Sequence, residues 1–97
     1  MNLRQVKILL KKNRETLKNR FYVKEIGVFG SYIDGSETPG SDIDILVSFE
    51  HDHKDFFNFI RLKYFLEDLF GTEVDLVMKD AVKPGLKKRI LNQVEYV

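Results

Sequence analysis

Three acidic residues lie in segments that are otherwise apolar. Asp42 and Asp44 are two residues apart in the segment 42–49, so alternation along a strand puts both side chains on the same face. Asp75 lies in a later apolar run, 73–78. Adjacent carboxylates repel, and one takes up a proton unless a cation neutralises them. Three oxygen ligands without His or Cys favour a hard ion, Mg²⁺ or Mn²⁺, over zinc.

A turn of small residues, Gly30-Ser31, precedes the acid pair by ten residues. Because Gly30 has no side chain, backbone amides there can approach an anion closely, and Ser31 adds a hydroxyl donor. Phosphate oxygens beside metal-binding carboxylates predict a phosphoryl or nucleotidyl transfer site. Asp75 is then the candidate to orient or deprotonate the acceptor hydroxyl. Taken alone, Asp42 is better interpreted as a cap or turn residue after Ser41, and only the ordered combination is specific.

Hydrophobic periodicity predicts the elements that position these residues. Asn2 is the expected N-cap of the first helix, Gly71 the expected stop of the second, and Gly27 leaves room for a close neighbour. The predicted elements are a helix over 3–19, a strand over 22–29, a turn-rich loop over 30–40, a strand over 42–49, a helix over 55–70, a strand over 73–78, a short helix over 86–94 and an extended end over 95–97.

This order predicts one domain over residues 1–97, of the α/β (α+β) class. We expect a small mixed sheet of three to four strands with helices packed on one side. The chain has no Cys, which excludes disulfides and thiol catalysis. No apolar run approaches the roughly 20 residues that span a bilayer, and the amino-terminal residues offer no signal-peptide core, so we expect a cytoplasmic protein.

The amino-terminal segment 1–24 is rich in Lys and Arg, with Glu15 as its single acid. Such asymmetry is typical either of a nucleic-acid or acidic-partner surface or of a solvated helix face. The net charge is only +1, and no aromatic residue interleaves the basic residues 4–18, so we favour the solvated face and consider nucleic-acid binding unlikely to be the function.

The motif Gly30-Ser31, ten residues, Asp42-Ile43-Asp44, with a third acid on a later strand, resembles that of the minimal nucleotidyltransferases of the polymerase-beta superfamily. The likeness covers nearly the whole chain, including the ending 86–97. It implies a polymerase-beta-like nucleotidyltransferase fold, with Gly30, Ser31 and Ser41 at the nucleotide, Asp42 and Asp44 as ligands of two Mg²⁺ ions, and Asp75 as a ligand of one ion and the base.

What is known of the family also implies a function. Members of this size are commonly antitoxins of HEPN-domain ribonuclease toxins, and transfer AMP from ATP to a tyrosine of the toxin. Larger members carry extra domains for the second substrate, so we expect a partner or a second copy of this chain to complete the acceptor site.

The loop after the turn departs from the family pattern Gly-Ser-x-Ala-Arg-Gly, because Asp34 occupies the position of the cation. A carboxylate near phosphate is repulsive. Either Asp34 points to solvent and another cation, Lys79, Lys83 or Lys87, serves instead, or the activity is reduced.

An alternative function is that of a catalytically weak or silent antitoxin that neutralises its partner by direct binding. The aromatic segment 56–59 would then matter more than the acids. We expect that segment to be a buried helix face, with one surplus Phe at most left for an interface.

Overall fold

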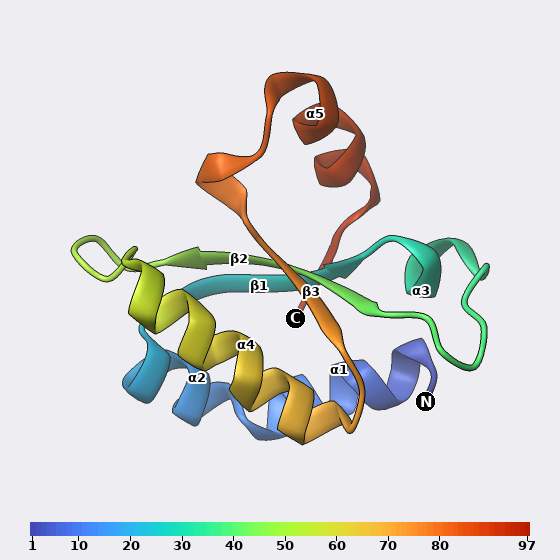
Figure 1. The fold of residues 1–97 in the computed structure, drawn as a ribbon, viewed down its shortest axis with the longest axis horizontal. Helices are drawn as coiled ribbons and strands as arrows, with labels where there is room; N and C mark the ends of the chain where they lie inside the picture. Colours follow the sequence, from blue (N-terminus) through green and yellow to red (C-terminus); the bar gives the residue numbers. More distant parts are fainter.

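The centre of the computed structural model, which describes residues 1–97, is a four-stranded mixed sheet (Figure 1). Its strands are β1 (Val23–Phe29), β2 (Ile43–Phe49), β3 (Val74–Met78) and β4 (Glu95–Tyr96). They lie in the order β3-β2-β1-β4, and β1 pairs antiparallel with both β2 and β4. Strand β3 runs parallel to β2, because helix α4 (Phe56–Phe70) connects the two strands as a crossover.

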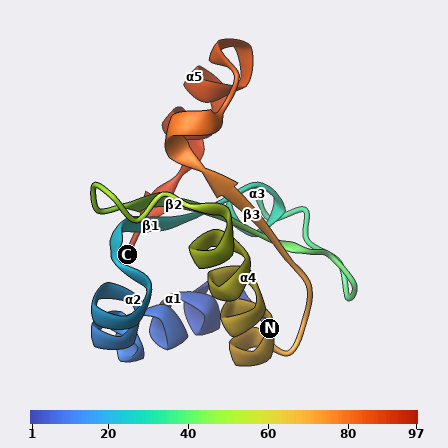
Figure 2. The same cartoon turned by 60° about the vertical axis from the view of Figure 1, so that its left-hand side comes forward.

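The sheet has helices on both sides. Helices α1 (Leu3–Lys12), α2 (Arg14–Phe21) and α4 pack on one side, as expected, and α5 (Pro84–Gln93) stands on the opposite side (Figures 1 and 2). A one-turn helix, α3 (Ser31–Asp34), follows β1, and a short 3-10 turn, η1 (Lys79–Ala81), follows β3. These elements give the mixed α/β fold that the sequence predicts.

The core lies between the sheet and helices α1, α2 and α4. Alternate strand residues point to these helices, as the period of two requires, and the amphipathic helix faces meet them. The strands contribute Ile26, Val28, Ile43, Ile45, Val47, Phe49, Val74 and Leu76, and the helices contribute Val6, Leu10, Leu17, Phe21, Leu62, Leu66 and Phe70. The other face of the sheet carries Asp44 and Asp75, together with the apolar Leu46 and Val77.

The prediction of one continuous helix over 3–19 is wrong, since the helix is broken at Asn13. The Asn13 side-chain amide donates to the Leu9 carbonyl at 2.8 Å, and its backbone N–H is shared between the Leu9 and Leu10 carbonyls. Asn competes in this way with regular helix hydrogen bonding. The break divides the segment into two helices, each of which buries its own apolar residues.

Other local predictions are confirmed. Asn2 caps α1, and its side chain accepts the Gln5 N–H at 2.9 Å. Gly71 ends α4 in the left-handed conformation. A Cβ on Gly27 would lie 2.7 Å from Val94 Cγ2, so this glycine lets β4 approach β1. The last helix starts at Pro84, two residues earlier than predicted, because Pro suits the first turn of a helix.

One aromatic prediction is wrong. The segment 56–59 was expected to form a buried helix face, but Phe56 and Phe57 are 69% and 73% exposed. They lie in the first turn of α4, which extends beyond the core. Of the three phenylalanines in this segment, only Phe59 packs against the core.

No helix of the structure is long and apolar enough to cross a membrane.

Candidate active site

Asp44 and Asp75 lie side by side on the sheet face away from the core. The parallel register of β2 and β3 pairs Asp44 with Asp75 directly. The neighbours Ile43 and Ile45 are fully buried on the opposite face, so alternation points the Asp44 carboxylate away from the core. Asp42 lies just before β2 and is exposed. The structure thus makes β2 and β3 neighbours, the condition on which the grouping of these two acids depends.

The pKa of Asp44 is raised to about 6. Burial is the largest cause, followed by repulsion from the Asp75 carboxylate, and Asp42 adds a smaller repulsion. The backbone N–H of Ser31 acts in the opposite direction, because it donates a hydrogen bond to the Asp44 carboxylate. The three acids therefore share one electrostatic environment, in which Asp44 carries its charge at a cost near neutral pH.

The Gly30-Ser31 turn lies directly against Asp44. Gly30 has φ 76°, and a Cβ at this residue would lie 2.0 Å from Asp44 Oδ2. No side chain fits there, so the absence of one is what lets the carboxylate lie against the turn. The Gly30-Ser31 turn, which the sequence predicts to bind phosphate, consequently lies at the same site as Asp44.

Helix α5 closes the other side of this turn. The Gly30 N–H donates to Gln93 Oε1 at 3.0 Å, across 63 positions of the sequence. A cavity of about 310 Å³ lies between the turn and one face of the helix. It is lined by Phe29, Gly30, Ser31, Asp34, Leu86, Arg89, Ile90 and Gln93.

Arg89 and Gln93 were missed in the sequence. The signal that could have found them is their spacing, because Leu86, Arg89 and Gln93 fall on the same helical face as Ile90. The periodicity shows that they share a face, but nothing in it shows that this face meets the Gly30-Ser31 turn.

Asp34 does not face the acid pair. Its Oδ1 accepts the Ser36 backbone N–H at 2.9 Å and the Ser36 hydroxyl at 2.5 Å. These bonds, and more weakly the charge of Arg89, hold the pKa of Asp34 below its usual value. The exposed carboxylate thus closes its own turn, an arrangement that short polar side chains favour in loops.

Ser41 is held within its loop. Its Oγ accepts the Thr38 backbone N–H at 2.8 Å and lies 3.2 Å from the Thr38 hydroxyl. Ser41 lines a different cavity from Gly30 and Ser31, together with Tyr32 and Gly71. Of the residues singled out in the sequence, the structure therefore groups Gly30, Ser31, Asp44 and Asp75 most closely.

The donor set suits a divalent metal ion. The acidic side chains at the site provide carboxylate oxygens, the ligands that hard divalent ions prefer. Part of the rise in the pKa of Asp44 comes from neighbouring negative charge, which a cation would neutralise. No three His, Cys, Asp or Glu side chains converge closely enough to form a complete metal site by themselves. Asp44 and Asp75 would provide two ligands, and the motif predicts Asp42, just before β2, as a third.

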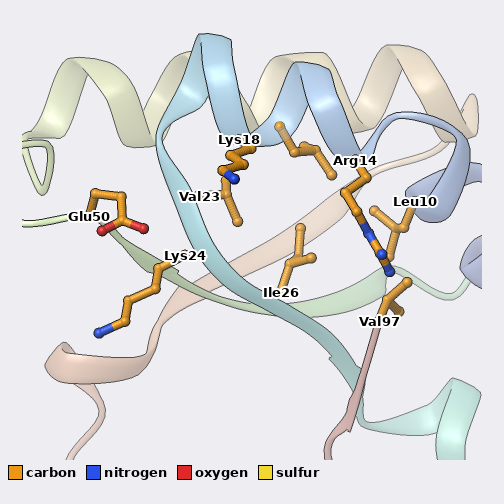
Figure 3. Close-up of a pocket in the computed structure, with 9 residues that line it drawn as sticks. Leu10, Arg14, Lys18, Val23, Lys24, Ile26, Glu50 and Val97 are labelled. Atoms are coloured by element: carbon orange, nitrogen blue, oxygen red, sulfur yellow. The ribbon is translucent and has the colours of Figure 1, made fainter.

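A separate cavity of about 320 Å³ lies between the α1–α2 corner and β1 (Figure 3). Arg14, Lys18 and Glu50 surround its apolar lining of core residues such as Leu10 and Ile26. Neither Asp44 nor Asp75 lines this cavity, so it is not part of the candidate active site.

The site thus combines a mixed sheet, a pair of acids on adjacent strands and an adjoining Gly-Ser turn. Residues 10–97 match the family model described as the nucleotidyltransferase domain. The chain belongs to this family and is a nucleotidyltransferase.

Relatives and solved structures agree with this family. Protein adenylyltransferase MntA of Thermococcus cleftensis is 44% identical over 97 residues, which are 100% of this chain and 97% of the relative. A crystal structure of a toxin–antitoxin with AMP-PNP has a TM-score of 0.70 and 27% identity, and covers 99% of this chain and 72% of the other.

A third comparison shows the fold alone. The structure of a tri-AMPylated Shewanella oneidensis HEPN toxin in complex with an MNT antitoxin has a TM-score of 0.68 at 24% identity. The match covers 94% of this chain and 70% of the other.

Proposed function

We propose that this chain transfers AMP from ATP, with Mg²⁺, to a tyrosine hydroxyl of a partner HEPN ribonuclease toxin, and that it thereby acts as the antitoxin. The observation that carries the proposal is the contact between the Asp44–Asp75 pair and the Gly30-Ser31 turn. Carboxylates in contact with a glycine-containing turn suit transfer of a nucleotidyl group better than any other chemistry at this site.

The comparisons support both the reaction and the partner. The relative from Thermococcus cleftensis is named a protein adenylyltransferase, and the toxin–antitoxin structure with AMP-PNP shares this fold. The motif resemblance adds the HEPN class of the toxin and the tyrosine acceptor.

The proposed roles follow from position. Asp42, Asp44 and Asp75 hold the metal ions, and Gly30 and Ser31 bind the phosphates, with Ser41 supporting the adjoining loop. Bound Mg²⁺ would neutralise these carboxylates and the charge that develops on the phosphate oxygens. The tyrosine oxygen bonds to the α-phosphorus while the bond to pyrophosphate breaks, and Asp75, which is exposed, accepts the hydroxyl proton.

A second function is favoured by one specific observation. The exposed rings of Phe56 and Phe57 pack edge to face, with centroids 6.0 Å apart, and offer an apolar surface for direct binding. In this alternative the chain neutralises its partner by contact, and the acids contribute little.

The experiment that separates the two functions weighs the partner. A HEPN-domain toxin is incubated with the chain, ATP and Mg²⁺, and its intact mass is measured. We expect a gain of one or more AMP units, which Asp44→Asn and Asp75→Asn abolish. Asp68→Asn, which removes an exposed acid on α4, is the matched control and should leave the gain unchanged.

Inhibition of the toxin without any gain in mass, retained in Asp44→Asn and Asp75→Asn, would overturn the enzymatic proposal. Loss of that inhibition in Phe57→Ser would then support neutralisation by contact.

A further inference from the structure

The cavity beside the Gly30-Ser31 turn has one cationic residue in its lining. Its walls are the turn itself, Asp34 and a single face of α5, which presents Leu86, Arg89, Ile90 and Gln93. Of these residues only Arg89 carries a positive charge. A phosphate chain bound at the turn would therefore meet a guanidinium group on the opposite wall of the same cavity.

Gln93 holds this wall in place. Its side-chain oxygen accepts the Gly30 N–H at 3.0 Å, one helical turn after Arg89. Helix α5 buries none of its residues, so this hydrogen bond and the pairing of β4 with β1 are the fixed points that keep α5 beside the turn. Arg89 is thus carried on a helix that is tied directly to the phosphate-binding turn.

Arg89 is also free to bind. The ion pairs of the structure join Lys7 to Glu95, Lys54 to Asp80 and Lys79 to Glu25, with His51 beside Asp52, and Arg89 is in none of them.

The other cations considered for this role are placed elsewhere. Lys79 donates to Glu25 Oε1 at 3.2 Å and lies over the Tyr96 ring, 5.4 Å from its centroid. Lys83 and Lys87 do not line the cavity. The sequence alone offered these three lysines as possible replacements for the missing cation, whereas the structure offers a different residue.

Asp34 and Arg89 form no direct ion pair, although the charge of Arg89 helps to lower the pKa of Asp34. Both bonds from Ser36 reach the same carboxylate oxygen, Oδ1, and no ion pair joins Asp34 to Arg89. The acid in the loop and the cation on α5 can therefore serve different partners, the first its own turn and the second a ligand.

We propose that Arg89 binds the phosphates of the donor nucleotide from α5, opposite the Gly30-Ser31 turn. The inference rests on the proposed function, and it assigns to the last helix a part in holding ATP. A planar guanidinium group suits this task, because it can donate two parallel hydrogen bonds to phosphate oxygens.

The test measures binding rather than turnover. Dissociation constants for ATP and for adenosine, each with Mg²⁺, are determined by calorimetry for the unaltered chain, Arg89→Ala, Arg89→Lys and Lys88→Ala. We expect Arg89→Ala to weaken ATP binding by about tenfold to a hundredfold, the factor for losing hydrogen bonds between charged groups, and to leave adenosine binding unchanged. Arg89→Lys should lose less, and Lys88→Ala should match the unaltered chain.

Three results would overturn the inference: unchanged ATP affinity in Arg89→Ala, an equal loss in Lys88→Ala, or an equal loss for adenosine. Transfer of AMP to the partner is measured in parallel and separates the two proposals. ATP binding that depends on Arg89 without any transfer contradicts only the proposed function. Transfer with an ATP affinity that ignores Arg89 contradicts only the inference.

Discussion

The two faces of β2 differ in what they do for the protein. Ile43, Ile45 and Val47 face the helices and are at most 1% exposed, whereas Asp44 faces the other way, beside Asp75. The first face stabilises the fold by burying apolar area. The second face carries the acids. There the pKa of Asp44 is raised to about 6, first by burial of its carboxyl group and then by repulsion from Asp75.

This difference shows that stability and chemistry are separated by a single residue along the strand. An acid at position 45 would lie in the core, where no cation could reach it. At position 44 the carboxylate is partly buried, which destabilises its charged form but leaves it accessible to a metal ion and a nucleotide.

The largest expected effect comes from a substitution on the face of β2 that carries Asp44. Asp44→Asn should lower the rate of AMP transfer by about a thousandfold, as loss of a central charge at a transfer site does. The same change should raise the melting temperature at pH 7, because it removes the repulsion from Asp75. Transfer is followed by the mass of the partner and stability by calorimetry. Retained transfer, or a lowered melting temperature, would contradict the view that the Asp44 face of β2 serves chemistry rather than stability.

The next largest effect comes from a substitution on the face of β2 that packs against the helices. Ile45→Ala should lower the free energy of unfolding by about 2–5 kcal/mol, since Ile45 is fully buried and its shortening leaves a cavity in the core. Denaturant unfolding measures it. Val77→Ala, on the face of the acids and only partly buried, is the matched control and should cost less.

A third prediction concerns the contact between turn and acid. Gly30→Ala and Gly35→Ala both place a side chain at positive φ, 76° and 81°. Gly35, with ψ 9°, lies in the left-handed helical region, where a side chain costs roughly 1–2 kcal/mol, whereas Gly30, with ψ −146°, lies in a region that essentially only glycine adopts. Only at Gly30 would the new methyl group collide with Asp44, because nothing lies within 4 Å of a Cβ at Gly35. Gly30→Ala should therefore lose both transfer and ATP binding, and Gly35→Ala mainly stability. Equal effects on ATP binding would show that the contact with Asp44 is unimportant.

The smallest effect depends on pH. The folded-state pKa of Asp44, about 6, lies above its ordinary value of 3.8, so the folded chain holds this proton more tightly than the unfolded chain. The resulting stabilisation is complete below pH 3.8 and is lost as the pH rises through about 6. Between pH 5 and pH 7 the melting temperature should consequently fall by a few degrees more than in Asp44→Asn.

Added Mg²⁺ should reverse this loss at pH 7 in the unaltered chain and have little effect on Asp44→Asn. A pH profile that is identical in the two proteins would contradict the assignment of the raised pKa to Asp44.

Local patterns predicted most of the fold, because strands and helix caps depend on neighbouring residues. The strands and the helix α4 lie within a residue of their expected bounds, and Asn2 and Gly71 cap as predicted. The break at Asn13 escaped prediction, since an apolar stripe continues across it and only a side-chain hydrogen bond reveals it. The exposure of Phe56 and Phe57 escaped for a similar reason, because composition does not show where a helix leaves the core.

The sequence by itself determined the acids, the Gly-Ser turn and their order, because the spacing of Asp42 and Asp44 and the apolar residues around them are local properties of a strand. Only the tertiary structure decided that Asp75 pairs with Asp44, that Gly30 touches Asp44 Oδ2, and that Arg89 and Gln93 meet the turn. Those contacts join residues far apart in the chain, and their register depends on how the whole sheet packs against its helices.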